Sequence, residues 1–289
     1  MNPALLIAGH GTRDVAGAAA FTALTERMAR RHADEMPVAG GFIELSEPPL
    51  KDAVVTLAGQ GHRDLVAVPL MLSAAGHSKG DIPAALARET ARHPGLSIRY
   101  GRPLGPHPVL LDLMAARIAA VTGPEPPAVL LVGRGTTDPD GNADVVKMAR
   151  LLWEGRNYEF TDTAFISLAR PSVPEGLERC RRLGARHIVV ARYFLFPGVL
   201  PDRVADQAAA FAASHPDLDV RTTDVLGDCD EIAGLVAERY HEALGGDIRM
   251  NCDMCVYRTA LPGFADRVGA PQHPHDHPDD HEHVHLHGA

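Results

Sequence analysis

The sequence predicts an α/β protein with two repeated lobes, a cleft between them and a disordered C-terminal tail. Each lobe is expected to hold a four-stranded, mainly parallel sheet flanked by helices. Short apolar, β-branched runs alternate with amphipathic stretches along the chain, a pattern typical of parallel strands joined by helical crossovers. The phrase Leu-Leu-Ile-Ala-Gly-His-Gly-Thr at 5–12 returns as Leu-Leu-Val-Gly-Arg-Gly-Thr at 130–136. The 289 residues, 45% of them hydrophobic, suffice for two domains of ordinary size.

The expected strands are short apolar runs, each followed by an amphipathic stretch. In the first half, strands are expected over 4–8, 38–43, 65–70 and 96–100, and helices over 18–31, 49–59, 83–92 and 108–121. In the second half, strands are expected over 128–132, 160–166, 187–193 and 219–223. A segment rich in proline and glycine, 122–127, separates the halves, as is common at domain boundaries.

We therefore expect four parts along the chain. They are an N-terminal lobe over 1–122, a C-terminal lobe over 127–245, an extension over 246–270 and a tail over 271–289. The tail has no apolar periodicity, and its histidines alternate with Asp, Pro and Glu, so it is expected to be disordered. These histidines are His273, His275, His277, His281, His283, His285 and His287.

The composition excludes several classes of function. A formal net charge of −9 argues against a nucleic-acid-binding surface, which would need a basic stripe. No apolar run approaches about 20 residues, the length that spans a bilayer. The N-terminus has no basic region before an apolar core, and four cysteines make a poor disulfide framework. We expect a cytoplasmic protein that binds neither nucleic acid nor membrane.

The two copies of the repeat differ at three positions that carry polar chemistry. The first copy has His10, Glu44 and His77 at these positions. Their counterparts in the second copy are Arg134, Ser167 and, roughly, Val199. A duplicated scaffold with these side chains in one copy alone predicts one chemical site per chain.

All three side chains follow expected strands of the N-terminal lobe. His10 lies two residues after its strand, Glu44 directly after its strand and His77 in the loop after the third. The carboxyl ends of parallel strands share one edge of a sheet, where ligands bind. Two imidazoles and a carboxylate form a facial site for a divalent metal, and neutral imidazole also accepts protons near pH 7. Taken singly, each has an ordinary alternative: a backbone hydrogen bond for His10, a helix cap for Glu44 and a polar loop for His77.

Three motifs together resemble the class II tetrapyrrole chelatases, the sirohydrochlorin cobaltochelatase and ferrochelatase family. They are Gly-His-Gly-Thr-Arg at 9–13, Phe-Ile-Glu at 42–44 with Glu-Pro at 47–48, and Gly-His-Ser-Lys-Gly-Asp-Ile-Pro at 76–83. The resemblance implies that His10 and His77 bind metal and accept protons, with Glu44 as their carboxylate partner. Asp81 and Pro83 match the family phrase and also suit the start of the next helix.

The implied substrate, sirohydrochlorin, is a polycarboxylate that positive side chains would help to bind. Arg13, Lys79 and Arg134 lie in or beside the motif loops and are the candidates. The alternative for each is a solvated surface charge.

Cys252 and Cys255 form a Met-x-Cys-x-x-Cys element in the extension. It resembles the same element of the long cobaltochelatases, which implies a [4Fe–4S] cluster. Two thiolates cannot complete a cluster, so the other ligands would come from a second chain of a homodimer, or from Cys180 or Cys229. A redox pair and half of a zinc site are the alternatives.

The leading functional hypothesis is a chelatase that inserts Co²⁺ into sirohydrochlorin for cobalamin biosynthesis. Within the same class, Fe²⁺ insertion for siroheme or Ni²⁺ insertion remains open. A different class is a metal-delivery or storage protein that acts through the histidines of the tail. A third is a redox protein that uses Cys252 and Cys255.

Overall fold

The structure is a computed structural model that describes residues 2–247, 257 and 265–270. Cys252, Cys255 and the histidines predicted for a disordered tail lie outside the described residues. The chain forms two compact units. The described residues of Met1–Leu104 and of Ala233–Ala289 belong to unit 1, and Gly105–Ile232 form unit 2.

Unit 1 is built on the four-stranded parallel sheet expected for the first half. Its elements are β1 (Ala4–Gly9), α1 (Val15–Arg31), β2 (Val38–Phe42), α2 (Leu50–Gly59), β3 (Asp64–Pro69), η1 (His77–Asp81), α3 (Ile82–Arg92), β4 (Ser97–Tyr100), most of α8 (Asp230–Gly245) and the short η3 (Ala265–Arg267). The strand order is β2-β1-β3-β4, and each neighbouring pair is parallel.

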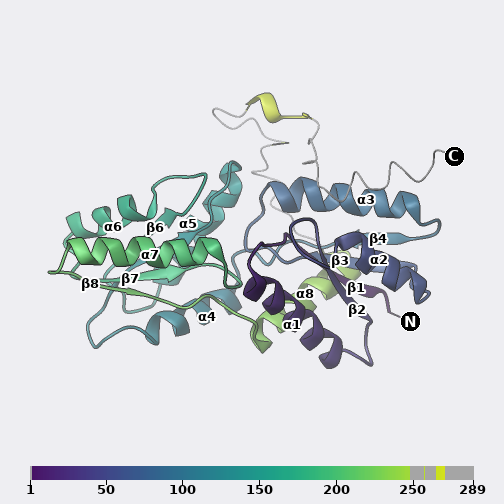
Figure 1. Cartoon of the computed structure of the whole chain (residues 1–289), viewed down its shortest axis with the longest axis horizontal. Helices are drawn as coiled ribbons and strands as arrows, with labels where there is room; N and C mark the ends of the chain where they lie inside the picture. The colour runs from purple at the N-terminus through teal and green to yellow at the C-terminus, as the bar shows by residue number, and fades with distance from the viewer. Residues whose placement is uncertain (1, 248–256, 258–264, 271–289) are drawn as a thin grey trace. The chain divides into compact units, whose positions relative to one another are not determined.

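The strand order decides which helices share a face of the sheet. The chain steps from β1 to β2 in one direction and then crosses back to β3 and on to β4. Right-handed crossovers therefore place α1 on one face and both α2 and α3 on the other. The core agrees, because buried side chains of α2 and α3 pack with those of β1 and β3. Figure 1 shows α3 and α1 on opposite sides of these strands.

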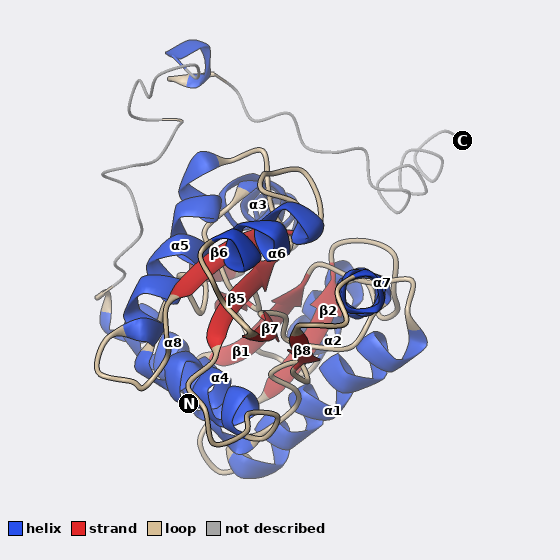
Figure 2. Cartoon of the chain, turned by 90° about the vertical axis from the view of Figure 1, so that its left-hand side faces the viewer, coloured by secondary structure: helices blue, strands red, loops and turns tan. Residues whose placement is uncertain are grey.

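Unit 2 repeats this architecture. Its elements are α4 (Pro108–Ala119), β5 (Ala128–Gly133), α5 (Pro139–Trp153), β6 (Thr161–Phe165), α6 (Val173–Arg182), β7 (His187–Arg192), α7 (Val199–Ser214) and β8 (Asp219–Thr222). The order is β6-β5-β7-β8, again parallel throughout. A core of buried residues lies between these strands and the pair α6 and α7. Figure 2 shows in red and blue that each sheet is flanked by helices.

The last helix of each repeat packs in the other unit. Helix α4 ends the first repeat, yet it packs against α5 and β7 of unit 2. Its Arg117 donates hydrogen bonds to the carbonyl oxygens of Val225 and Leu226, at 3.0 and 2.9 Å. Helix α8 ends the second repeat and lies in unit 1 from Ala233 onward. The compact units therefore differ from the lobes expected at 1–122 and 127–245 by the exchange of these helices.

A buried arginine holds α8 in unit 1. Arg239 is 0% exposed and donates hydrogen bonds to the carbonyl oxygens of Pro103 and Leu104, at 3.1 and 3.0 Å. Glu242 lies 3.0 Å from Arg239 and accepts two hydrogen bonds from Arg102, at 2.8 and 2.6 Å. A buried charge needs such partners to offset its lost hydration. Unit 1 thus depends on contacts between residues about 140 positions apart in the sequence.

Within the described ranges, no helix is both long and apolar enough to span a membrane.

Candidate active site

The loops that carry His10 and Glu44 are joined by main-chain hydrogen bonds. His10 directly follows the buried strand β1, and Glu44 follows β2 by two residues. The amide of Ile43 donates to the carbonyl of Gly9, and the amide of Glu44 donates to the carbonyl of His10, both at 3.0 Å. The sheet pairing of β1 with β2 thus continues past the strand ends and places the two side chains side by side.

Gly11 allows this close approach of the two loops. Its φ is +109°, and a Cβ there would stand 1.6 Å from the carbonyl oxygen of Glu44. The Ser46 hydroxyl accepts a hydrogen bond from the Thr12 amide at 2.9 Å and donates one to the Thr12 carbonyl at 2.6 Å. Both interactions fix the loop of the first motif against that of the second.

His77 begins a π-helical turn, η1, which runs directly into α3. The Ile82 amide donates to the His77 carbonyl and closes this turn. The Ser78 hydroxyl exchanges hydrogen bonds with the amide and carbonyl of Ala75, at 3.1 and 2.9 Å. Tyr100, at the end of β4, donates to the Ser78 carbonyl at 2.8 Å. The turn that carries His77 is therefore fixed from two sides.

These three loops bring His10, Glu44 and His77 into contact. The Nε2 atom of His10 lies 2.8 Å from Nε2 of His77 and 3.1 Å from Oε1 of Glu44. The two rings stand edge to face, with centroids 4.0 Å apart at 87°. The side chains are 18%, 22% and 22% exposed for His10, Glu44 and His77. The cluster is shielded on most sides and still reachable by solvent.

Two donor-atom distances at His10 can be compared with those expected around a divalent metal. With metal–ligand bonds of about 2.1 Å, two ligands at right angles lie about 3 Å apart. The two measured distances, 2.8 and 3.1 Å, are close to that value. Among the described residues no three His, Cys, Asp or Glu side chains are grouped as a ready metal site. At His10 the donor atoms contact one another directly, so an entering cation would replace hydrogen bonds that now join them.

The hydrogen-bond partners also constrain the ring protons. The carboxylate of Asp81 lies 2.6 Å from Nδ1 of His77, and because a carboxylate accepts only, this nitrogen donates. Nδ1 of His10 lies 3.1 Å from the carbonyl oxygen of Gly11, another acceptor. With His77 protonated on Nδ1, the contact between the two Nε2 atoms can be a hydrogen bond donated by His10 Nε2–H to His77 Nε2.

The three basic candidates lie in different settings. Arg13 is exposed in the loop before α1, and Lys79 is half-buried within η1. Arg134 is exposed in unit 2, directly after β5. Arg13 and Lys79 therefore lie in the loops that carry His10 and His77.

The two described cysteines belong to unit 2. Cys180 is buried in α6, and burial raises the pKa of its thiol to about 12. Cys229 is half-buried, and burial raises the pKa of its thiol as well. Both thiols are poor sources of the thiolate that a cluster needs.

Sequence reasoning missed the partners that hold the motif loops. Asp81 does stand at the start of α3, as expected, but its side chain makes no cap hydrogen bond there and contacts His77 instead. The spacing of four residues, one helical turn, is the signal that could have paired them. Ser46 and Tyr100 form hydrogen bonds to loops that are distant in the sequence, and no local sequence pattern predicts such contacts.

The second repeat keeps the backbone of this site without its chemistry. The Ser167 amide donates to the Arg134 carbonyl at 2.9 Å, as the Glu44 amide does to His10. A Cβ on Gly135 would stand 1.8 Å from the Ser167 carbonyl oxygen. Leu168 has a positive φ of 59°, and its counterpart Leu45 has a φ of 64°. Unit 2 therefore repeats the loop architecture with side chains that could not bind a metal in the same way.

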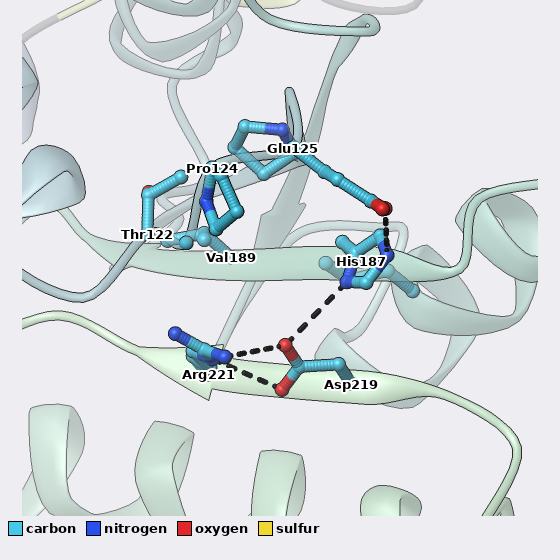
Figure 3. Close-up of a pocket in the computed structure, with 10 residues that line it drawn as sticks. Thr122, Pro124, Glu125, His187, Val189, Asp219 and Arg221 are labelled. Atoms are coloured by element: carbon cyan, nitrogen blue, oxygen red, sulfur yellow. Dashed lines mark hydrogen bonds and ion pairs between the residues drawn. The ribbon is translucent and has the colours of Figure 1, made fainter.

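A separate cavity of about 210 Å³ lies in unit 2 beside the segment that joins the repeats. His187 lies 2.5 Å from a Glu125 oxygen and 3.5 Å from an Asp219 oxygen (Figure 3). Arg221, with help from His187, holds the pKa of the Asp219 carboxyl below its usual range. These residues are at the amino ends of β7 and β8, whereas ligands of parallel sheets bind at the carboxyl ends. The polar groups of this cavity are paired with one another.

Comparison with known proteins decides the family. The model of the CbiX family matches residues 4–121 and again residues 128–243. The chain belongs to the CbiX family. The resemblance predicted from the three motifs is thereby confirmed, and the two matches follow the two repeats.

Relatives of this CbiX-family chain include both cobalt and iron chelatases. It is 35% identical over 262 residues to a sirohydrochlorin cobaltochelatase of Priestia megaterium, across 89% of this chain and 85% of that protein. It is 31% identical to a sirohydrochlorin ferrochelatase of the same organism, across 71% of this chain and 77% of that protein. SirB from Bacillus subtilis with Fe³⁺ has a similar structure, with a TM-score of 0.73 and 28% identity over 86% of this chain and 97% of that one.

Proposed function

We propose that this CbiX-family protein is a sirohydrochlorin chelatase that inserts Co²⁺ into the macrocycle, a step of cobalamin biosynthesis. The observation that carries the proposal is the contact of His10 with both His77 and Glu44, at 2.8 and 3.1 Å. These donors are partly exposed at the carboxyl ends of β1, β2 and β3, where parallel sheets bind their ligands.

In the proposed reaction, Co²⁺ is a substrate held loosely before transfer. His10, His77 and Glu44 supply three ligands and leave the other coordination positions open to water or the macrocycle. As the cation enters, the free-base ring loses two pyrrole N–H protons, and four ring nitrogens replace the protein ligands. The imidazoles that release the metal are then free to accept those protons. The same nitrogens thus serve first as metal ligands and then as bases.

Charged side chains near the site would orient the polycarboxylate substrate. Arg13 and Lys79 lie in the same loops as His10 and His77 and are proposed to bind carboxylates of the macrocycle. Arg134 of unit 2 is proposed for the same role. Arginine and lysine suit carboxylates because their hydrogen bonds to them are charge-assisted.

Cobalt is proposed because the relative that matches across 89% of this chain is a cobaltochelatase. Iron for siroheme is the alternative within the class, since a ferrochelatase also matches. The donor set does not separate Co²⁺ from Fe²⁺ or Ni²⁺, because affinities follow the general order of divalent metals.

The extension and tail are proposed to bind metals of their own. Cys252 and Cys255 would hold part of a [4Fe–4S] cluster, completed by the same pair in a second copy of the chain. Anaerobic reconstitution should then leave iron and sulfide bound, and their absence would contradict the cluster. The histidines of 271–289 would supply Co²⁺ to the site, and truncation after Gly269 should then slow turnover at limiting metal. Unchanged turnover would contradict this supply role.

The test of the proposed function is anaerobic incubation of the protein with sirohydrochlorin and Co²⁺, Fe²⁺ or Ni²⁺ in parallel. Insertion is followed in the visible spectrum of the macrocycle. We expect fastest turnover with Co²⁺ and a loss of most turnover in His10→Ala. The matched control is His32→Ala, whose side chain is also 18% exposed and pairs with a carboxylate, Glu35, at 2.7 Å.

The same variants separate the competing classes. A metal-delivery protein that acts through its tail would keep its function in His10→Ala with the tail intact. A redox protein would lose function when Cys252 or Cys255 is replaced and keep it in His77→Ala. Wild-type turnover in His10→Ala would reject the chelatase mechanism.

A further inference from the structure

We infer that Asp81 is a positioning residue that orients His77 and fixes which ring nitrogen faces the metal. The inference rests on the proposed function of His77 as a ligand. Oδ2 of Asp81 lies 2.6 Å from Nδ1 of His77, on the side of the ring away from His10. A carboxylate accepts only, so Nδ1 carries the proton. In a neutral imidazole the other nitrogen, Nε2, then presents its lone pair.

That lone pair points at the proposed cation position. Nε2 of His77 is the atom 2.8 Å from Nε2 of His10. The opposite tautomer would place a proton on this nitrogen and leave no electron pair for a metal. Metal-bound histidines commonly donate their second N–H to a carboxylate or carbonyl, which sets the ring orientation and strengthens the ligand.

The local backbone holds both partners in place. His77 and Asp81 are the first and last residues of η1, one turn apart, so they share one side of the helix. Ser78, between them, is 1% exposed and tied to Ala75 and Tyr100. Burial holds the pKa of the Tyr100 phenol above its usual range, so this hydroxyl remains a donor to the Ser78 carbonyl.

Among the described histidine–carboxylate contacts, the one between Asp81 and His77 is both short and shielded from solvent. Glu89 beside His93 is equally buried, at 6% exposed, but lies 3.6 Å away. The Asp81 side chain is 7% exposed, whereas Glu35 beside His32 is 38% exposed and Asp219 beside His187 is 39% exposed. The distance from His187 to Asp219 is 3.5 Å, against 2.6 Å at His77. A short contact shielded from water is the one able to constrain a ring.

The first test reads the tautomer of His77 directly. In ¹⁵N-histidine-labelled full-length protein at about pH 8, above the usual imidazole pKa of about 6.5, the wild type should show His77 with its proton on Nδ1. Asp81→Asn keeps the size of the side chain and removes the charge, so the Nε2–H form should become populated. An unchanged His77 signal would overturn the inference.

The second test is a double-mutant cycle on Co²⁺ binding without tetrapyrrole. Because the histidines of 271–289 are also candidate ligands, binding at the site is read from paramagnetic broadening of the His10 ring signals. Asp81→Asn should weaken this binding roughly 10- to 100-fold, and Asp81→Glu should restore part of it. In a His77→Ala background, Asp81→Asn should change binding by less than about twofold, since the two residues act as one unit.

The outcomes separate this inference from the proposed function. If His77→Ala binds Co²⁺ and turns over like the wild type, both fail together. The inference alone fails if His77→Ala weakens Co²⁺ binding but Asp81→Asn does not. It also fails if Asp81→Asn weakens binding equally in the wild type and in the His77→Ala background. Asp219→Asn is the control, with the same substitution beside a histidine of unit 2, and it should bind Co²⁺ like the wild type.

Discussion

The carbonyl oxygen of Glu44 occupies the space into which a side chain on Gly11 would project, 1.6 Å from an ideal Cβ. The first two motifs are therefore coupled through the backbone as well as through His10 and Glu44. A substitution in one loop should displace the side chain, His10 or Glu44, that the other loop carries.

Gly11→Ala is expected to abolish most turnover and to lower the free energy of unfolding by more than about 1 kcal/mol, because both its φ and its surroundings exclude a Cβ. Gly61→Ala is the control. Gly61 has a φ of +92° with no described atom within 4 Å of its Cβ position. Its replacement by alanine therefore costs only the free energy of holding a non-glycine residue at positive φ. Urea unfolding and the insertion assay check both variants. Equal effects of the two would show that the approach to Glu44 is unimportant.

Glu44→Gln should weaken Co²⁺ binding at the site and reduce turnover at least about tenfold while leaving stability nearly unchanged. The amide keeps the size of the side chain but loses the charge that would face the proposed cation, and a tenfold change corresponds to about 1.4 kcal/mol. Glu35→Gln removes a carboxylate that also bonds a histidine, His32 at 2.7 Å, and should leave turnover intact. A full rate in Glu44→Gln would remove the carboxylate from the proposed ligand set.

Glu242 should make unit 1 sensitive to acid. Its hydrogen bonds from Arg102 hold the pKa of the carboxyl below its usual range. Its stabilisation is therefore complete above the unfolded pKa of about 4.3 and is lost as the pH falls through the lower folded value. In the wild type, the urea concentration at the unfolding midpoint should fall between about pH 5 and pH 3, and in Glu242→Gln this fall should be smaller. An unaltered pH profile in this variant would contradict the assignment, and the exposed Glu26 of α1, 64% exposed, provides the control Glu26→Gln.

Arg239→Ala should destabilise the protein by at least about 1–3 kcal/mol, because it leaves the main-chain carbonyls of Pro103 and Leu104 without their buried donor, while Glu242 keeps Arg102. Arg186→Ala is the comparison. Arg186 pairs with Asp217 at 2.6 Å but is 67% exposed, so its loss should cost about 0–1 kcal/mol. Chemical denaturation monitored by circular dichroism measures both. Similar losses in the two variants would argue against a buried anchor at Arg239.

The sequence was sufficient to predict the strands and the sheet edge where His10, Glu44 and His77 meet. Apolar runs end one or two residues before His10 and Glu44, and parallel pairing brings those ends together. Helix α1 begins at Val15 rather than near 18, because Asp14 caps it by accepting from the Gly17 amide at 2.9 Å. Local patterns carry this kind of information well.

Contacts between distant segments could not be predicted in the same way. The π-helical turn at His77–Asp81 precedes the helix expected over 83–92, and nothing in the apolar periodicity distinguishes it from a loop. The exchange of α4 and α8 depends on partners such as Arg239 with Pro103. Periodicity indicates which face of a helix is buried but not against which sheet.

The exchange of α8 has a consequence for synthesis of the chain. The ribosome completes the strands that carry His10, Glu44 and His77 early, yet the helix that packs in the same unit emerges only after about 240 residues have been made. Until then the nascent first unit lacks a permanent partner for part of its surface. The compact unit that carries these three side chains can therefore be completed only after nearly the entire second repeat has been translated.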